Sequence, residues 1–196
     1  MRYVELDGGV GEMTGVIDPR PYLAELPGFA ERLPPGAREF ATDPDHYAFR
    51  GRRCVKDLAP QGAVRSGEDG IEIRFRHNCW KHEEDLVIRY TGVSVFRADG
   101  LDETGERGER GERGERGETE VLDVPEGPGV RDLSVLGDVI LDEVLPAPGG
   151  CTHEIGCRPG TLFVACRDLS AEWSVADCPE ARGGRGLRWS GDDPGS

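Results

Sequence analysis

The chain reads Gly70-Ile71-Glu72-Ile73-Arg74-Phe75-Arg76 where its alternation of apolar and polar side chains is clearest. Successive side chains of a strand point to opposite faces, so this period of two predicts a strand with one buried and one solvated face. The segment 86–90 repeats the pattern, and we expect the two segments to form neighbouring antiparallel strands. At 93–95 the apolar phase is reversed, which indicates a bulge or a bend at Thr91-Gly92.

The second half of the chain adds further strand-like runs, and no helical pattern separates them. Proline and glycine residues at 146–150 and 158–160 provide turns between them. Strands are expected at 134–145, 151–157, 161–166 and 171–175. Short strands without intervening helices favour a mainly β fold, an antiparallel sheet or a small sandwich, over a parallel α/β fold.

The chain is expected to divide into an arm, a domain and a tail. Prolines in the first part allow only short helices, around Tyr22 to Leu26 and Gly36 to Thr42, within an otherwise irregular N-terminal arm packed on the domain. A Gly-Glu-Arg repeat indicates a disordered insertion, and a polar, glycine-rich C-terminus indicates a disordered tail. The expected ranges are 1–49 for the arm, 50–178 for the antiparallel β domain, 99–130 for its insertion and 179–196 for the tail.

The formal net charge is −14, from 24 basic and 38 acidic residues. A surface of this sign repels phosphate backbones and anionic lipids, so we expect no nucleic-acid and no membrane partner, whereas a basic protein partner fits. The amino terminus lacks an apolar signal region, and a cytoplasmic location is expected. In that reducing compartment the six cysteines are expected to be thiols or metal ligands rather than disulfides.

Three of the four histidines and three of the six cysteines gather in two short segments, 77–82 and 151–157. Residues two apart on a strand share a face, so each segment presents an imidazole beside a thiol. Two such pairs would supply the tetrahedral nitrogen and sulfur ligands that zinc prefers. The candidate metal ligands are His77, Cys79, Cys151 and His153, with His82 and Cys157 in reserve. The competing interpretation is that these cysteines are small core residues and that the histidines are hydrogen-bonded at strand ends.

Two catalytic arrangements are compatible with the same segments. His153 could form an acid/base pair with one of the nearby carboxylates, which are Asp142, Glu143, Glu154 and Asp168. Alternatively, Cys79 or Cys151 could be a nucleophile with His82 or His153 as its base. Because no nucleotide loop, nucleophile elbow or oxyanion-hole signature accompanies either arrangement, a non-enzymatic protein is favoured, and the catalytic residues stay unknown.

Aromatic and basic residues give weaker indications. A ligand groove could be lined by Trp80, Tyr90, Phe96 and Trp173, although aromatic residues at strand spacing favour a core position. The basic segment Arg50-Gly51-Arg52-Arg53 is expected to form internal ion pairs, because the rest of the chain is acidic.

Four segments carry a resemblance to known proteins. They are 40–47 (Phe-Ala-Thr-Asp-Pro-Asp-His-Tyr), 53–58 (Arg-Cys-Val-Lys-Asp-Leu), 77–82 (His-Asn-Cys-Trp-Lys-His) and 139–144 (Val-Ile-Leu-Asp-Glu-Val). Through them the chain resembles uncharacterised actinobacterial conserved hypothetical proteins over roughly 38–178, and this resemblance implies an expressed domain but no catalytic residue. The run Leu-x-Ile-x-Tyr-x-Gly-Val at 86–93 is similar to small β-rich bacterial immunity and accessory proteins.

These observations favour a small acidic cytoplasmic protein that binds another protein without catalysing a reaction, as immunity-like or accessory proteins do. The alternative is a zinc-binding domain, or a small metal-dependent enzyme, built on the Cys/His cluster. No cofactor is expected from the sequence, although the pattern is compatible with zinc. The identity of the partner and the oligomeric state are left open by the sequence.

Overall fold

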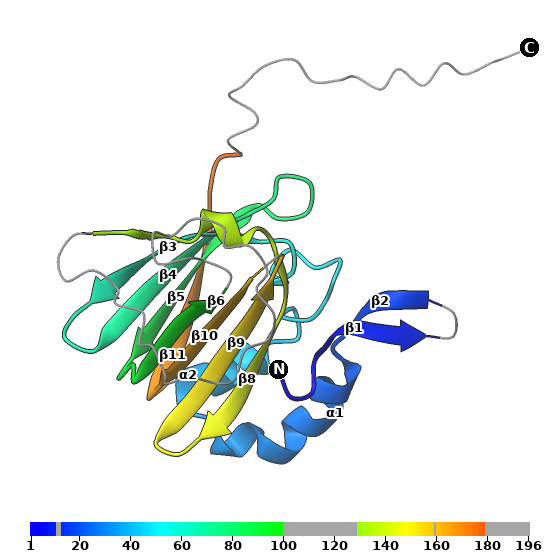
Figure 1. Ribbon diagram of the computed structural model, residues 1–196, viewed down its shortest axis with the longest axis horizontal. Coiled ribbons are helices and arrows are strands. Elements are labelled where there is room, and N and C mark those ends of the chain that lie inside the picture. The colour runs from blue at the N-terminus through cyan, green and yellow to red at the C-terminus, as the bar shows by residue number, and fades with distance from the viewer. Residues whose placement is uncertain (11–12, 100–128, 159, 179–196) are drawn as a thin grey trace, which may run out of the picture.

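The computed structural model describes residues 1–10, 13–99, 129–158 and 160–178, and its strands form two main antiparallel sheets and a separate hairpin (Figure 1). The first sheet has the order β11 (Asp168–Val175), β5 (Glu84–Thr91), β4 (Gly70–Arg76), β3 (Ala59–Ser66) and β7 (Arg131–Asp132). The second has the order β6 (Val95–Asp99), β10 (Thr161–Cys166), β9 (Gly150–Cys157) and β8 (Val139–Ala147). The hairpin pairs β1 (Glu5–Val10) with β2 (Met13–Asp18). The mainly β prediction is confirmed.

The alternating stretch at 70–76 forms β4, and β4 pairs antiparallel with β5 as expected, with Ile73 opposite Ile88. The reversed phase after β5 marks the point at which the chain changes sheets. Gly92 has a φ of 62°, in the left-handed region that favours glycine, and β6 then pairs with β10 in the second sheet. The expected bend therefore moves the chain from one layer of the molecule to the other.

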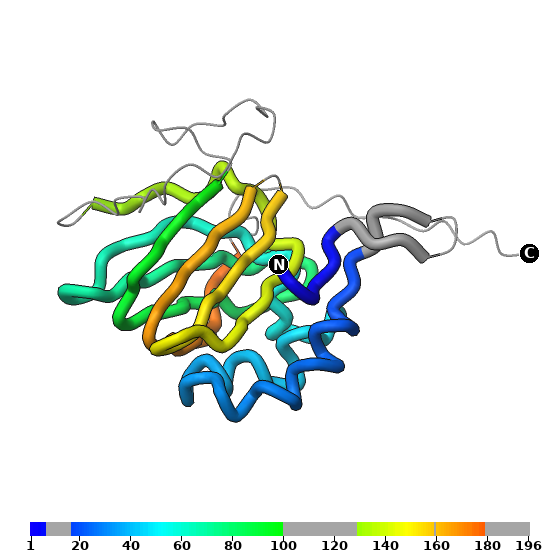
Figure 2. The backbone as a smooth tube through the Cα atoms, turned by 60° about the horizontal axis from the view of Figure 1, so that its bottom comes forward, coloured from blue at the N-terminus to red at the C-terminus, as the bar shows by residue number. Residues whose placement is uncertain are grey.

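The two sheets face each other in the two views of the backbone (Figures 1 and 2), and buried side chains from both sheets form the core. Side chains that are at most 1% exposed include Ile73, Leu86 and Ile88 from the first sheet and Leu141, Leu162 and Val164 from the second. Each such side chain contributes about 1.5–3 kcal/mol relative to an exposed position. A hydrogen bond of 2.8 Å between Tyr90 Oη and His153 Nδ1 also joins the layers.

The N-terminal arm contains the two expected short helices, α1 (Arg20–Phe29) and α2 (Pro35–Ala41). Proline occupies the first turn of both helices, where its missing N–H costs no intrahelical hydrogen bond. Helix α2 contacts β11 and β8, which are edge strands of the two sheets, so it bridges the layers. A 3-10 turn, η1 (Ala30–Arg32), lies between the helices, and a second, η2 (Ser134–Leu136), precedes β8.

Aromatic side chains attach this arm to the sandwich. Tyr22 is fully buried, and its hydroxyl donates a hydrogen bond of 2.8 Å to the carbonyl of Val144 in β8. Phe29 and Phe40 are each 5% exposed. Most of the predicted insertion at 99–130 and all of the predicted tail at 179–196 lie outside the described residues. Within the described ranges, no helix has the length and apolar composition needed to cross a membrane.

Candidate functional site

Residues 77–83 connect β4 to β5 and form a surface segment that we call the 77–83 loop. At its start, Asp85 Oδ1 accepts the backbone N–H of His77 at 2.8 Å and lies 2.6 Å from His77 Nδ1. Toward its end, the ring of His82 contacts the carbonyl of Cys54 and the side-chain oxygen of Asn78, both at 2.8 Å. The loop is therefore anchored on both sides by buried or partly buried contacts.

Ion pairs from the preceding segment hold the same loop. Arg52 Nη1 lies 2.9 Å from a Glu83 carboxylate oxygen, and Arg53 makes a two-pronged contact with Glu84 at 2.8 and 2.9 Å. The hydrogen bonds from Arg53 lower the pKa of Glu84 below its ordinary value. For Arg52 and Arg53, the expectation that the basic segment forms internal ion pairs is confirmed.

A third attachment is covalent, because Cys79 forms a disulfide with Cys178, with Cα atoms 5.7 Å apart. Our expectation of thiols is wrong for these two cysteines. The strand register explains why the two cysteines are close. Strand β11 runs antiparallel to β5, and Val175 lies opposite Glu84, so the residues after β11 lie beside the 77–83 loop. A separation of 99 residues gives no spacing signal from which the pair could be recognised.

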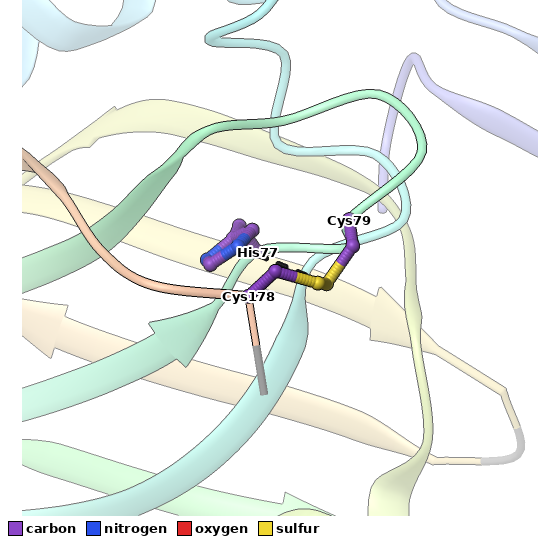
Figure 3. A group of neighbouring side chains, drawn as sticks. All are labelled: His77, Cys79 and Cys178. Atoms are coloured by element: carbon purple, nitrogen blue, oxygen red, sulfur yellow. Dashed lines mark hydrogen bonds between the residues drawn. A yellow bond between two sulfur atoms is a disulfide. The ribbon is translucent and has the colours of Figure 1, made fainter. Parts of the chain in front are cut away.

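His77 stands beside this disulfide, with its Nε2 atom 3.9 Å from Cys79 Sγ (Figure 3). The ligand atoms of His77, Cys79 and Cys178 lie within 4.8 Å of one another, and the three residues could hold a metal ion. His77 is 4% exposed, whereas both cysteines are partly exposed. Because Asp85 engages Nδ1, a neutral ring keeps its lone pair on Nε2, the nitrogen that faces the sulfurs.

The other two predicted ligands lie elsewhere. Cys151 and His153 are in β9, each 1% exposed, and neither belongs to the group of close ligand atoms around His77. His153 bonds to the hydroxyl of Tyr90 in the core. The structure thus brings His77 and Cys79 together and leaves Cys151 and His153 outside that group.

His153 belongs instead to a chain of side chains that we call the buried network, formed by His46, Asp142, His153 and Tyr90. The two carboxylate oxygens of Asp142 contact His46 Nε2 and His153 Nε2, both at 2.8 Å. His46 Nδ1 also faces the carbonyl of Phe40 at 3.0 Å. All four members of the network are at most 2% exposed.

The donors and acceptors of the buried network match completely. Tyr90 donates to His153 Nδ1, and His153 Nε2 donates to Asp142. Both ring nitrogens of His46 face oxygen atoms, the carbonyl of Phe40 and the carboxylate of Asp142. Burial alone would raise the pKa of Asp142, but the contacts with His46 and His153 outweigh it and hold that pKa well below its ordinary range. The network leaves no ring nitrogen for a substrate.

The remaining acid/base candidates are engaged as well. The Glu143 carboxylate accepts the backbone N–H groups of residues 2–4 at 2.6 to 2.8 Å. The Asp168 carboxylate accepts the first free N–H groups of α2, at 2.9 Å from Ala37 and 3.2 Å from Gly36. Glu154 forms an ion pair with the amino group of Met1 at 2.7 Å. Each contact satisfies backbone or terminal groups.

The cysteines that remain thiols are all buried: Cys54, Cys151, Cys157 and Cys166. Cys151 and Cys166 are opposite each other on β9 and β10, with sulfurs 3.6 Å apart. The hydrogen bond with Cys151, together with burial, raises the pKa of Cys166 far above its ordinary value. Burial raises the pKa of Cys157 to about 12. Such thiols are poor nucleophiles.

Trp80 has the most exposed aromatic side chain in the described ranges, with 77% of its surface accessible at the tip of the 77–83 loop. Beside it lies a cleft of about 320 Å³ whose walls include Asp57, Arg76 and Asp138. The Nζ atom of Lys81 lies 5.9 Å from the ring centre of Trp80. Of the other groove candidates, Tyr90 and Phe96 are core residues at 1% exposure, and Trp173 is partly buried.

Sequence reasoning missed three residues of these sites. Asp85 was hidden within the alternating pattern of β5, and Cys178 stands alone after the last strand. His46 occurs in the arm, far from the other histidines. The signal that could have indicated Asp85 is its place as the second residue of the strand that follows the His-x-Cys segment.

No protein-family model, curated protein or solved structure matches this chain.

Proposed function

We propose that the protein is a non-enzymatic binding module that holds a basic protein partner on the 77–83 loop, with Trp80 as its anchor. The observation that carries this proposal is the exposure of Trp80, 77%, on a loop that is otherwise tied down at both ends. Tryptophan is enriched among the residues that dominate binding energy at protein interfaces.

The attachments of the loop favour binding because they reduce its entropic cost. A flexible loop loses conformational freedom when a partner orders it, at about 0.5–1.5 kcal/mol for each side chain immobilised. Here the disulfide at Cys79 and the contacts of His77 and His82 already hold the backbone on both sides of Trp80. Val175, 82% exposed and opposite Glu84, adds apolar surface at the same end of the molecule.

The charge of the whole chain favours a basic partner. The cleft beside the exposed indole has both signs of charge, because Asp57 and Asp138 line it together with Arg76. Lys56 and Lys81 contact Asp57. A cation seated over the indole ring gains about 0.5–2 kcal/mol, and the net charge of −14 attracts a basic protein over a longer range.

The engagement of the acid/base candidates supports a binding role over catalysis. A general base must reach a substrate proton at hydrogen-bond distance. The histidine and carboxylate of the best-formed pair, His153 and Asp142, are each 1% exposed and fully bonded within the protein.

The test compares two truncations of exposed apolar residues. Immobilised wild type, Trp80→Ala and Val130→Ala are incubated with an extract at low salt, and the bound proteins are quantified by mass spectrometry along a salt gradient. Val130 is 64% exposed and lies outside the loop, so it is the matched control. We expect basic proteins that elute with salt, recovered equally by wild type and Val130→Ala and at least tenfold less by Trp80→Ala, which corresponds to about 1.4 kcal/mol. Recovery that does not depend on Trp80 or on salt would rule the proposal out.

The group of His77, Cys79 and Cys178 favours a second candidate, a zinc-binding domain. One imidazole nitrogen and two sulfurs are ligands that suit zinc better than the oxygen-seeking ions magnesium and calcium. Elemental analysis of protein purified under reducing conditions without chelator tests this candidate. We expect near-stoichiometric zinc, and protein free of zinc after incubation with the ion would exclude it.

A further inference from the structure

We propose that the Cys79–Cys178 disulfide and a zinc centre at His77, Cys79 and Cys178 are alternative states of one group, and that reduction of the disulfide opens the metal site. This inference rests on the second candidate function above and adds its regulation. Figure 3 shows the three side chains converging, with His77 beside the bond between the two sulfurs.

The orientation of His77 is the first support. Asp85 Oδ1 accepts the backbone N–H of His77 and also contacts its ring Nδ1, so turning the ring away would lose the Nδ1 contact. Zinc-binding histidines commonly donate their second ring N–H to a carboxylate in this way, which fixes the ring and increases the basicity of the ligating nitrogen. The ring is 4% exposed, so its position is also set by packing.

The distances are the second support. Bond lengths of about 2.0 Å to nitrogen and 2.3 Å to sulfur place these two ligand atoms about 3.5 Å apart around a tetrahedral ion. His77 Nε2 and Cys79 Sγ are 3.9 Å apart, and all three ligand atoms lie within 4.8 Å of one another. A rotation of the cysteine side chains after the sulfur–sulfur bond is broken is enough to complete the arrangement. Water would take the fourth position, as in zinc sites that have three protein ligands.

The chemistry of sulfur makes the two states exclusive. Zinc binds thiolates, and a disulfide has none. Reduction by a phosphine breaks the S–S bond: the phosphine takes the oxygen of a water molecule and becomes the phosphine oxide, while the two sulfurs take two electrons and two protons. Zinc then forms two Zn–S bonds as both thiols release their protons.

Accessibility distinguishes this pair from the other close pair of sulfurs. Cys79 and Cys178 are partly exposed, so a reductant and a metal ion can reach them. Cys151 and Cys166 are 1% and 6% exposed in the core and have no histidine in their group. Because Cys79 precedes Trp80, the disulfide and the zinc centre would each hold the exposed indole in place, whereas reduced, metal-free protein would release this attachment.

The experiment uses the full chain and cobalt(II) as a spectroscopic substitute for zinc. Metal-free protein is titrated with cobalt chloride before and after treatment with a phosphine reductant, and zinc is then added in competition. We expect thiolate-to-cobalt charge-transfer absorption and tetrahedral visible bands in the reduced protein alone, at one ion per chain, with both lost on addition of zinc. Intact mass and thiol alkylation verify the redox state.

Variants assign the ligands. Cys79→Ser and Cys178→Ser should each weaken cobalt binding at least tenfold, and Asp85→Asn should weaken it about 10–100-fold by releasing the histidine. Cys157→Ala, which removes a buried thiol outside the group, is the matched control and should bind as wild type does. Reduced wild type that binds no cobalt, or binding that survives both serine substitutions, would overturn the zinc centre itself. Equal binding by oxidised and reduced protein would overturn the redox control while leaving the metal site standing.

Discussion

The buried network and the 77–83 loop each contain a histidine paired with a carboxylate, but the two pairs differ in what surrounds them. In the network, His153 and Asp142 are 1% exposed, and each of their polar atoms has a partner inside the protein. In the loop, Asp85 occupies only one nitrogen of His77, and the other faces two sulfurs near the surface. The same pair of residue types therefore stabilises the core in one place and leaves a ligand atom available in the other.

From this contrast we infer that the two regions have different roles. Groups that are buried and fully bonded set the stability of the fold, because removing one partner leaves an unpaired charge in the core. Groups at the surface that keep a free lone pair or an exposed ring are available for binding. Substitutions in the two regions should separate stability from binding.

The largest effect is expected from Asp142→Asn. The amide cannot replace the charge that both histidines face, so we expect a loss of about 3–5 kcal/mol in the free energy of unfolding. Urea denaturation followed by circular dichroism measures it. Asp45→Asn, at an exposed position next to His46, is the control and should change stability by less than about 0.5 kcal/mol. A comparably small loss for Asp142→Asn would show that the network is not a main source of stability.

Opening the disulfide by Cys178→Ser should cost about 2–4 kcal/mol, because the bond closes a long loop in the unfolded chain. The sequence separation that it spans is 99 residues. Denaturation of the variant under oxidising conditions should match that of reduced, metal-free wild type. If the variant were as stable as the oxidised wild type, the disulfide would not be formed in solution.

Acid should reveal the depressed pKa of Asp142. A carboxyl group whose folded pKa is lowered contributes stability that is fully present above its unfolded pKa, near 4, and is lost as the pH falls through the folded pKa. Below about pH 4 we therefore expect wild type to lose stability more steeply than Asp142→Asn. Parallel stability curves for the two proteins in that range would contradict the assignment.

The smallest effect on stability is expected from Trp80→Ala. The side chain is 77% exposed, so its removal should change the free energy of unfolding by less than about 0.5 kcal/mol. Thermal and urea denaturation compare it with wild type. A loss of more than about 1.5 kcal/mol would mean that the indole packs against the protein and is not held free for a partner.

Much of the fold could be predicted because side-chain alternation reports burial directly. The strand at 70–76 and its partner are confirmed, since their apolar residues face one core. Strand β3 was missed because Pro60 and Gly62 lower strand propensity, and the structure accommodates them at a shift in register. A Cβ atom added at Gly62 would collide with Val130 and Arg131, so the close approach of β7 requires glycine at this position.

The candidate site was only half predictable. His77 and Cys79 were found because neighbours in the sequence share a strand end, and this information is local. Cys178 and Asp142 reach their partners through sheet pairing and packing, across 99 residues for Cys79 and 96 for His46. These long-range contacts depend on how the strands of both sheets pair, and the spacing of residues in the sequence does not reveal that pairing.

We propose that the 77–83 loop binds the partner through Trp80 and that the buried network contributes only to stability. The most direct test is the ratio of partner recovered by Trp80→Ala to that recovered by wild type, measured at low salt with equal amounts of folded protein. We expect a ratio below about one tenth with unchanged stability. A ratio near one would show that Trp80 does not anchor the partner.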